Sequence, residues 1–199
     1  RARLVGSEMC IRDRITGAQC SFSVGAIQEN KETILNCFEE AESVESDIVI
    51  FPELAITGYP PEDLLLRESF IGKNFAVLEE IAAFSSHTSG VIGFVDRKND
   101  PHNQDNNKRT IANAAAIVQN GDVRGIYHKS FLPNYSVFDE ARYFSKGTEP
   151  NTLFWYDDIA IGINICEDIW IEDGPAEEQV KQGASPVSYT HLTLPTKVY

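Results

Sequence analysis

The middle of the chain alternates between short apolar segments and longer segments with apolar residues at helical spacing. Residues 47–51 and 90–95 are short apolar runs, which predicts buried strands, and a first short strand is expected over residues 16–22. The segments after Asn30 and Glu68 place apolar residues three and four positions apart. This spacing predicts two helices, the first with Asn30 as its N-cap. The pattern therefore predicts a mixed α/β fold with buried strands.

Turn signals organise the second half of the chain. The dipeptide Asn120-Gly121 separates the apolar runs 111–119 and 122–128. It predicts a β-hairpin, because both of its residues tolerate positive φ. Asp157-Asp158 is expected to turn one short strand into the next in the same way, and Pro175 suits the first turn of a helix.

The last apolar run, residues 159–166, has two unlike faces. Its isoleucines occupy alternate positions and share one face, while the opposite face carries only short side chains: Ala160, Gly162, Asn164 and Cys166. We expect such a strand to be covered on both faces, one of them at very close range.

Three of the strand-like segments end on a residue that can do chemistry: Glu53, Lys129 and Cys166. A carboxylate can take the proton of a thiol, the thiolate can attack a carbonyl carbon, and an ammonium group can stabilise the oxyanion that forms. Taken singly, each residue has a simpler interpretation, since a cysteine after an apolar strand commonly packs as a small hydrophobe. Together they predict thiol-based acyl transfer, provided that the fold brings the strand ends together.

The sequence around these three residues resembles a known superfamily. Residues 51–59 (FPELAITGY), 128–144 (HKSFLPNYSVFDEARYF) and 165–170 (ICEDIW) are similar, in this order, to its glutamate, lysine and cysteine segments. The superfamily is that of the carbon–nitrogen hydrolases, or nitrilases.

Two stretches resemble one branch in particular, the N-terminal glutaminase domain of glutamine-dependent NAD synthetases. They are residues 60–67 (PPEDLLLR) and 132–135 (LPNY). The resemblance extends from about Ile15 to about Ser185 and so covers most of the chain.

The resemblance implies a nitrilase-like four-layer α-β-β-α sandwich that hydrolyses L-glutamine through a thioester. Cys166 is then the nucleophile, Glu53 the general base and Lys129 the group that stabilises the oxyanion. Four further residues are implied in supporting positions: Tyr135 contacting the glutamine, Glu140 holding Lys129, and Tyr59 and Asp168 around them.

The resemblance also implies a partner domain that these residues do not contain. Ammonia from glutamine would serve the amidation of nicotinic acid adenine dinucleotide to NAD in a C-terminal synthetase domain, whose glycine-rich phosphate loop is absent here. ATP and Mg²⁺ belong to that domain, no cofactor is expected for this one, and a homo-oligomer is expected at full length. Two alternatives remain: a stand-alone amidase of the same superfamily acting on another small amide, and a non-enzymatic interaction module in which Cys166 only packs. An activated Cys166 is expected to react below the ordinary thiol pKa of about 8.5.

Composition narrows the class of partner and the compartment. A formal charge of −13 argues against nucleic acid and anionic membranes, which attract basic patches. No run is long and apolar enough to span a membrane. The cysteines show no C-x-x-C spacing, which indicates reduced thiols and a cytoplasmic location: Cys10, Cys20, Cys37 and Cys166. The histidines form no ligand-like cluster, so no metal site is expected: His87, His102, His128 and His191.

Both ends of the chain differ from the rest. Residues 1–14 and 187–199 fit neither the hydrophobic pattern nor the resemblance, and we interpret them as non-native tails around a partial carbon–nitrogen hydrolase domain at 15–186. We expect the tails to add nothing to the fold and the edge of the Cys166 strand to be unpaired. The chain alone is then expected to be marginally stable and poorly active on glutamine.

Overall fold

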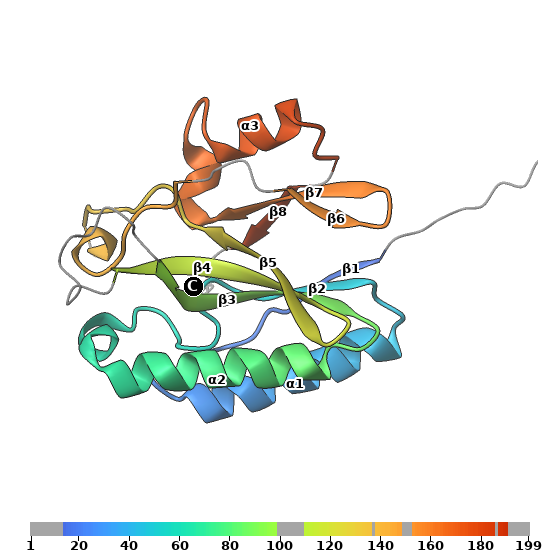
Figure 1. Ribbon diagram of the computed structural model, residues 1–199, viewed down its shortest axis with the longest axis horizontal. Helices are drawn as coiled ribbons and strands as arrows, with labels where there is room; N and C mark the ends of the chain where they lie inside the picture. Colours follow the sequence, from blue (N-terminus) through green and yellow to red (C-terminus); the bar gives the residue numbers. More distant parts are fainter. Residues whose placement is uncertain (1–13, 99–109, 137, 149–152, 186, 191–199) are drawn as a thin grey trace, which may run out of the picture.

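The computed structural model describes residues 14–98, 110–136, 138–148, 153–185 and 187–190. They form four layers, α-β-β-α, as the resemblance implied (Figure 1). Helices α1 (Ile27–Ser43) and α2 (Glu68–Phe84) cover the outer face of a five-stranded sheet. A three-stranded sheet packs on the inner face of the first, and α3 (Pro175–Lys181) covers it from outside.

The larger sheet has its five strands in sequence order. The first three strands are parallel and the last two run antiparallel to their neighbours. Their bounds are β1 Ile15–Gly17, β2 Ile48–Ile50, β3 Ser89–Lys98, β4 Thr110–Gln119 and β5 Asp122–His128. The predicted first strand is thus shorter than expected, and the strand predicted at 90–95 is longer.

The smaller sheet places the cysteine-bearing strand in its centre. Strand β7 (Ile159–Ile165) pairs antiparallel with β6 (Leu153–Tyr156) and parallel with β8 (Val187–Thr190). Three short 3₁₀ helices complete the described elements: η1 Glu62–Leu66, η2 Glu140–Arg142 and η3 Cys166–Trp170.

Strand β8 corrects two expectations about the end of the chain. Residues from 187 onward were expected to add nothing to the fold, yet four of them form a strand. The edge of the Cys166 strand was expected to be unpaired, yet β8 pairs with it from Gly162 to Ile165. The physical reason is that an open strand edge presents free N–H and C=O groups, which any extended segment within reach can satisfy.

The two predicted hairpins are confirmed. Asn120 and Gly121 link β4 to β5 with positive φ angles of 51° and 82°. Asp157, with φ of 48°, opens the turn from β6 to β7. Pro175 is the first residue of α3, as predicted.

The predicted N-cap at Asn30 is wrong. Helix α1 begins at Ile27, so Asn30 lies inside its first turn and is buried. Its side-chain amide donates to the carbonyls of Ser23 and Ile56, and its carbonyl oxygen accepts from the Ser23 amide. The side chain ties the helix to two neighbouring segments instead of capping it.

The predicted two-faced character of β7 is confirmed. Its isoleucines 161, 163 and 165 pack between the sheets with residues of the larger sheet such as Tyr127 and Ile117. The opposite face packs so closely on α3 that a Cβ at Gly162 would lie 2.5 Å from Oε1 of Gln179. Burial of both faces holds the end of β7, and therefore Cys166, in a fixed place.

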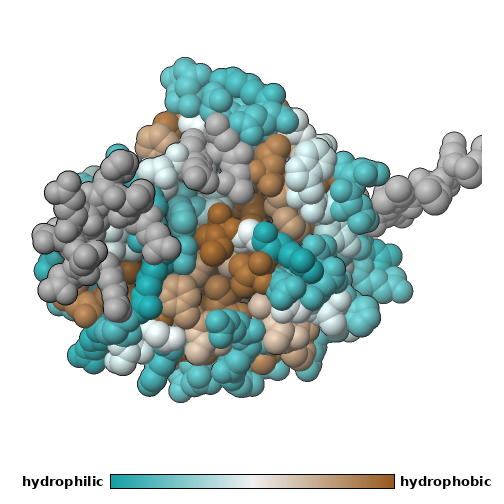
Figure 2. Space-filling model, viewed as in Figure 1, coloured by the Kyte–Doolittle hydropathy of each residue, from teal (hydrophilic) through white to brown (hydrophobic). Residues whose placement is uncertain are grey.

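A second apolar core lies between the larger sheet and the helices α1 and α2. On the face shown in Figure 2, apolar side chains gather at the centre, where the sheets meet, and hydrophilic ones lie above over α3. None of the helices in the described part of the chain combines the length and the apolar character that crossing a membrane requires.

Candidate active site

Glu53 follows β2 in a tight segment that lies against β3. Leu54, the next residue, has a backbone φ of 51°, and residues other than glycine adopt this left-handed conformation at a cost in free energy. Gly93 of β3 permits this approach, because a Cβ there would lie 2.4 Å from Leu54 N and from Pro52 O. The Glu53 side chain is held at the sheet with 3% of its residue surface exposed.

Lys129 follows β5 and is completely buried. Its Nζ atom donates to Glu53 Oε1 at 2.6 Å and to both carboxylate oxygens of Glu140 at 2.9 Å. Burial alone would lower the pKa of Lys129, but the two carboxylates outweigh it and raise the pKa above its ordinary value. Lys129 is therefore a fixed positive charge between two carboxylates.

Glu140 opens η2 and accepts hydrogen bonds from Lys129 through both of its carboxylate oxygens. Its Oε1 also accepts a hydrogen bond from the Tyr59 hydroxyl at 2.9 Å. Burial, followed by the negative charge of Glu53, raises the pKa of Glu140, while Lys129 acts in the opposite direction. Burial and then the Glu140 charge likewise raise the pKa of Tyr59, which remains a hydrogen-bond donor.

Asn113, in the middle of β4, completes the cluster and was not predicted. Its Nδ2 atom donates to Glu53 Oε1 at 2.6 Å, and its backbone carbonyl accepts from the Lys129 amide at 2.9 Å. The signal that could have revealed it is a single amide side chain among alanines in an otherwise apolar strand. All hydrogen bonds to Glu53 seen among the described residues reach Oε1, so Oε2 remains available to accept a proton.

Cys166 begins η3 directly after β7, with a backbone φ of 46°. A left-handed conformation at a residue other than glycine stores strain and is characteristic of functional sites. Burial, followed by the charge of Glu53, raises the pKa of the thiol to about 12, while Lys129 acts in the opposite direction. The raised pKa keeps the thiol protonated at neutral pH, so its reaction there depends on a base.

Asp168 joins the cysteine segment to the lysine segment. Its Oδ1 accepts from the backbone amides of Ser130 and Phe131, and its Oδ2 accepts from the Tyr127 hydroxyl and the Ile165 amide. The carboxylate is completely buried, and this burial raises its pKa. Asp168 thus fixes the end of β7 relative to the residues that follow Lys129.

Tyr135 lies at the surface beside the cysteine segment. Its hydroxyl donates to Glu167, the residue after Cys166, at 3.0 Å, and its ring packs edge-on against Phe138. Tyr135 is 56% exposed, so its ring is accessible from solvent. The role of Glu167 was not predicted.

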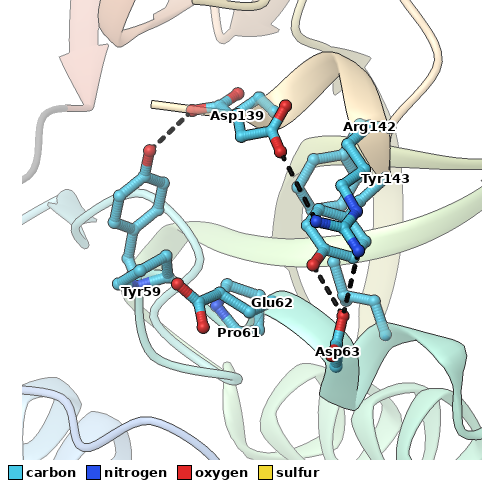
Figure 3. A pocket seen from close by; sticks show the side chains of 11 residues that line it. Tyr59, Pro61, Glu62, Asp63, Asp139, Arg142 and Tyr143 are labelled. Atoms are coloured by element: carbon cyan, nitrogen blue, oxygen red, sulfur yellow. Dashed lines mark hydrogen bonds and ion pairs between the residues drawn. The ribbon is translucent and has the colours of Figure 1, made fainter. Parts of the chain in front are cut away.

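A pocket of about 230 Å³ lies beside the cluster, on the side of Tyr59 and Glu140 (Figure 3). Arg142, Tyr143 and Asp63 point toward one another in it, with the Tyr143 hydroxyl 2.7 Å from an Asp63 oxygen. Neither Glu53 nor Cys166 lines this pocket, so it lies next to the cluster and not over the thiol. Within the described residues, no group of three or more His, Cys, Asp or Glu side chains is arranged to hold a metal ion.

The fold therefore brings together the three residues at the ends of β2, β5 and β7 that the sequence predicted. Glu53, Lys129 and the predicted support Glu140 are in direct contact, and the charges of all three influence the Cys166 thiol. The other predicted residues lie around this cluster. Tyr59 bonds to Glu140, Asp168 bonds to the backbone amides of the residues that follow Lys129, and the hydroxyl of Tyr135 bonds to Glu167.

Comparison with known proteins agrees with this geometry. Residues 14–185 match the carbon-nitrogen hydrolase family. A glutamine-dependent NAD(+) synthetase from Aquifex aeolicus is 39% identical over 170 residues, which are 85% of this chain and 28% of that protein. One from Thermotoga maritima is 40% identical over 164 residues, 80% of this chain and 26% of the relative.

Solved structures show the same fold. The glutamine-dependent NAD+ synthetase of Acinetobacter baumannii matches with a TM-score of 0.78 and 34% identity, over 90% of this chain and 32% of that one. An amidase from Nesterenkonia sp. matches with a TM-score of 0.75 over 93% of this chain and 66% of its own, at 19% identity that supports the fold alone. The chain spans less than a third of the NAD synthetases that it matches. By fold and by sequence, the chain belongs to the carbon-nitrogen hydrolase family.

Proposed function

We propose that this chain is the glutamine-hydrolysing part of a glutamine-dependent NAD synthetase. The observation that carries the proposal is the buried cluster of Glu53, Lys129 and Glu140 beside a strained, protonated cysteine. Identity of 39–40% to curated NAD synthetases over most of the chain supports glutamine as the amide. The ammonia would amidate nicotinic acid adenine dinucleotide in a synthetase domain that lies outside these residues.

The reaction begins with a proton transfer. Glu53 takes the proton of Cys166 through Oε2, which accepts no hydrogen bond from the described residues, and the thiolate attacks the side-chain carbonyl carbon of glutamine. Glu53 then gives the proton to the departing ammonia, which leaves a γ-glutamyl thioester on Cys166. Glu53 next activates a water molecule, which releases glutamate and restores the thiol.

The oxyanion of each tetrahedral intermediate needs positive charge close by. Lys129 supplies it together with a backbone N–H that follows Cys166. Glu140 holds Lys129 through both of its oxygens, so the ammonium group stays in place when Glu53 becomes neutral. Tyr135 binds the glutamine from the exposed side, and Glu167, bonded to it, orients it.

The wider setting follows from the same proposal. We expect L-glutamine as substrate, a C-terminal synthetase domain as partner, and a homo-oligomer at full length. ATP and Mg²⁺ are needed only in the synthetase domain. The reduced, unpaired state of the cysteines among the described residues supports a cytoplasmic location.

The test is direct detection of the thioester. The chain is mixed with L-glutamine, quenched in acid and analysed by mass spectrometry for a γ-glutamyl group on the peptide that contains Cys166, while ammonia is measured in a coupled assay. The adduct and the ammonia should both be absent in Cys166→Ala, whose folding is checked by circular dichroism. L-Asparagine, one methylene shorter, is the matched control substrate.

Three results would count against the proposal in different ways. Ammonia release that survives in Cys166→Ala refutes the nucleophile. A thioester with small aliphatic amides but not with glutamine favours the stand-alone amidase. No adduct with any amide, in a folded protein that also contains the synthetase domain, favours the interaction module, since the chain alone is expected to be poorly active.

A further inference from the structure

Outside the active site, the structure brings two more cysteines together. Cys20 lies in the segment after β1, and Cys37 lies on α1, 17 positions further along the chain. Their sulfur atoms are 3.2 Å apart, and both side chains are free thiols with partial exposure to solvent. Neither takes part in the cluster around Cys166.

We propose that Cys20 and Cys37 are an oxidation site, which forms a reversible intramolecular disulfide when the protein meets a peroxide. The proposal concerns a part of the molecule that glutamine hydrolysis does not use. It therefore stands or falls independently of the proposed function.

The geometry leaves little distance to close. A disulfide needs the two sulfur atoms to be about 2 Å apart, so they must approach by about 1 Å. Cys20 belongs to neither a helix nor a strand, and its segment can shift by this amount without breaking regular hydrogen bonds. Cys37 lies within α1 and stays in place.

The chemistry is a balanced two-electron oxidation. The Cys20 sulfur attacks one oxygen of hydrogen peroxide, breaks the O–O bond and becomes a sulfenic acid, with release of one water. The Cys37 sulfur then attacks the Cys20 sulfur, and hydroxide leaves with the Cys37 proton as a second water. Two thiols are oxidised, one peroxide is reduced, and a dithiol reductant reverses the bond.

The order of the two steps follows from the environment of each thiol. Burial, and then the hydrogen bond to Cys20, raise the pKa of Cys37 to about 12. The raised pKa keeps the proton on the Cys37 sulfur at neutral pH, while either sulfur can be the donor in the contact between the two thiols. Cys20 is the sulfur that meets the oxidant, and Cys37 is the one that resolves it.

Metal binding is a poorer account of the same pair. Two thiolates alone do not make a stable protein site, since structural zinc takes four ligands. No third His, Cys, Asp or Glu joins the pair to form a candidate metal group in the part of the chain that the structure describes.

The cross-link would tighten a segment that supports the active site. The Gly25 amide donates to the Thr57 carbonyl at 2.9 Å. Ser23 lies close to Gly58, because a Cβ added at Gly58 would be 2.6 Å from the backbone carbonyl oxygen of Ser23. Because residues 54–58 follow Glu53 directly, a bond that ties this segment to α1 restricts the base-bearing loop as well.

The test uses the reduced 199-residue chain and hydrogen peroxide. Trypsin cuts after Arg14, Lys31 and Arg67, so the two cysteines fall on separate peptides, 15–31 and 32–67. Non-reducing mass spectrometry should find these two peptides linked, with two hydrogens lost, in monomeric protein. The melting midpoint should rise by about 5–10 °C on oxidation, because the bond closes a loop in the unfolded chain, and fall again with a dithiol reductant.

Two variants and one condition act as controls. Cys37→Ser must abolish the linked peptide, and Cys166→Ser, which also removes one thiol, must leave it. In concentrated urea the disulfide should no longer form preferentially between Cys20 and Cys37. This condition tests whether the pairing depends on the folded geometry, without any substitution. Peroxide that leaves both thiols free, a sulfinic acid at Cys20 without a link, linkage to another cysteine or between chains, or a lowered midpoint would each overturn the proposal.

Discussion

Replacing Lys129 by methionine keeps the length and volume of the side chain and removes its charge from a completely buried site. Three hydrogen bonds of 2.6–2.9 Å to Glu53 and Glu140 are lost, and two buried carboxylates face each other without a cation. Removing one partner of a buried ion pair costs about 3–5 kcal/mol. The free energy of unfolding of a domain is only about 5–15 kcal/mol, so the Lys129→Met variant should lose a large share of it. Its melting midpoint should fall by about 6–20 °C.

The loss should depend on pH in a defined direction. Without Lys129, burial and mutual repulsion raise the folded-state pKa of both carboxyl groups above the unfolded value of about 4.3. The folded variant then binds protons that the unfolded chain releases, so its stability increases as the pH falls through the folded pKa. In the unsubstituted protein the raised pKa of Lys129 acts in the same direction but at a higher pH, because its contribution to stability is complete below the unfolded lysine pKa and is lost only as the pH rises through the folded value.

The assay is urea unfolding followed by circular dichroism at about pH 8 and about pH 5. Lys181→Met is the matched control, because Lys181 is 57% exposed and its 2.9 Å ion pair with Glu178 should be worth less than about 1 kcal/mol. A loss at pH 8 no larger than in this control, or no recovery at pH 5, would refute the account of Lys129 as the counter-ion of two ionised carboxylates.

Three further predictions follow from the same geometry. Glu53→Gln should slow thioester formation on Cys166 by about 10²–10⁴-fold, because the substitution removes the proton acceptor and keeps the shape of the side chain. Mass spectrometry of quenched samples measures the rate, and a near-normal rate would indicate that Glu140 is the base. Gly93→Ala should lower the melting midpoint and the thioester yield together, because its Cβ would lie 2.4 Å from the backbone beside Glu53, whereas Gly125→Ala, with 3.5 Å to its nearest neighbour, should do neither. Alkylation of Cys166 by iodoacetamide should keep accelerating up to about pH 10, because its raised pKa of about 12 keeps it protonated, and a plateau near the ordinary thiol value of about 8.5 would contradict this.

The features that the sequence predicted correctly depend on neighbouring residues. Asn120-Gly121 turned β4 into β5 because positive φ is a local property. The alternation of large and small residues in β7 indicated two covered faces, because side chains of a strand point to alternate sides whatever the rest of the fold. Glu53, Lys129 and Cys166 were identified by their places at strand ends, although their mutual contacts depended on the resemblance.

The features that were missed depend on residues far apart in the chain. Asn30 suits an N-cap by type, and only the packing of α1 against the segment after Glu53 shows that it is buried within the first turn. Asn113 reaches Glu53 across 60 residues, and Cys20 meets Cys37 only because the segment after β1 lies against α1. No periodicity or spacing contains this information.

The buried cluster also explains why two carboxylates surround one lysine. With the thiol protonated, Glu53, Glu140 and Lys129 together carry one net negative charge, and a free thiolate would add a second in a site that excludes water. Transfer of the thiol proton to Glu53 moves the negative charge to sulfur without increasing the total, which costs far less in a low dielectric. Once Glu53 is neutral, Glu140 is the carboxylate that still hydrogen-bonds to Lys129, and its charge opposes the tendency of burial to remove the lysine proton. The bond from Lys129 to both oxygens of Glu140 therefore keeps it charged and in position at the moment when the oxyanion forms.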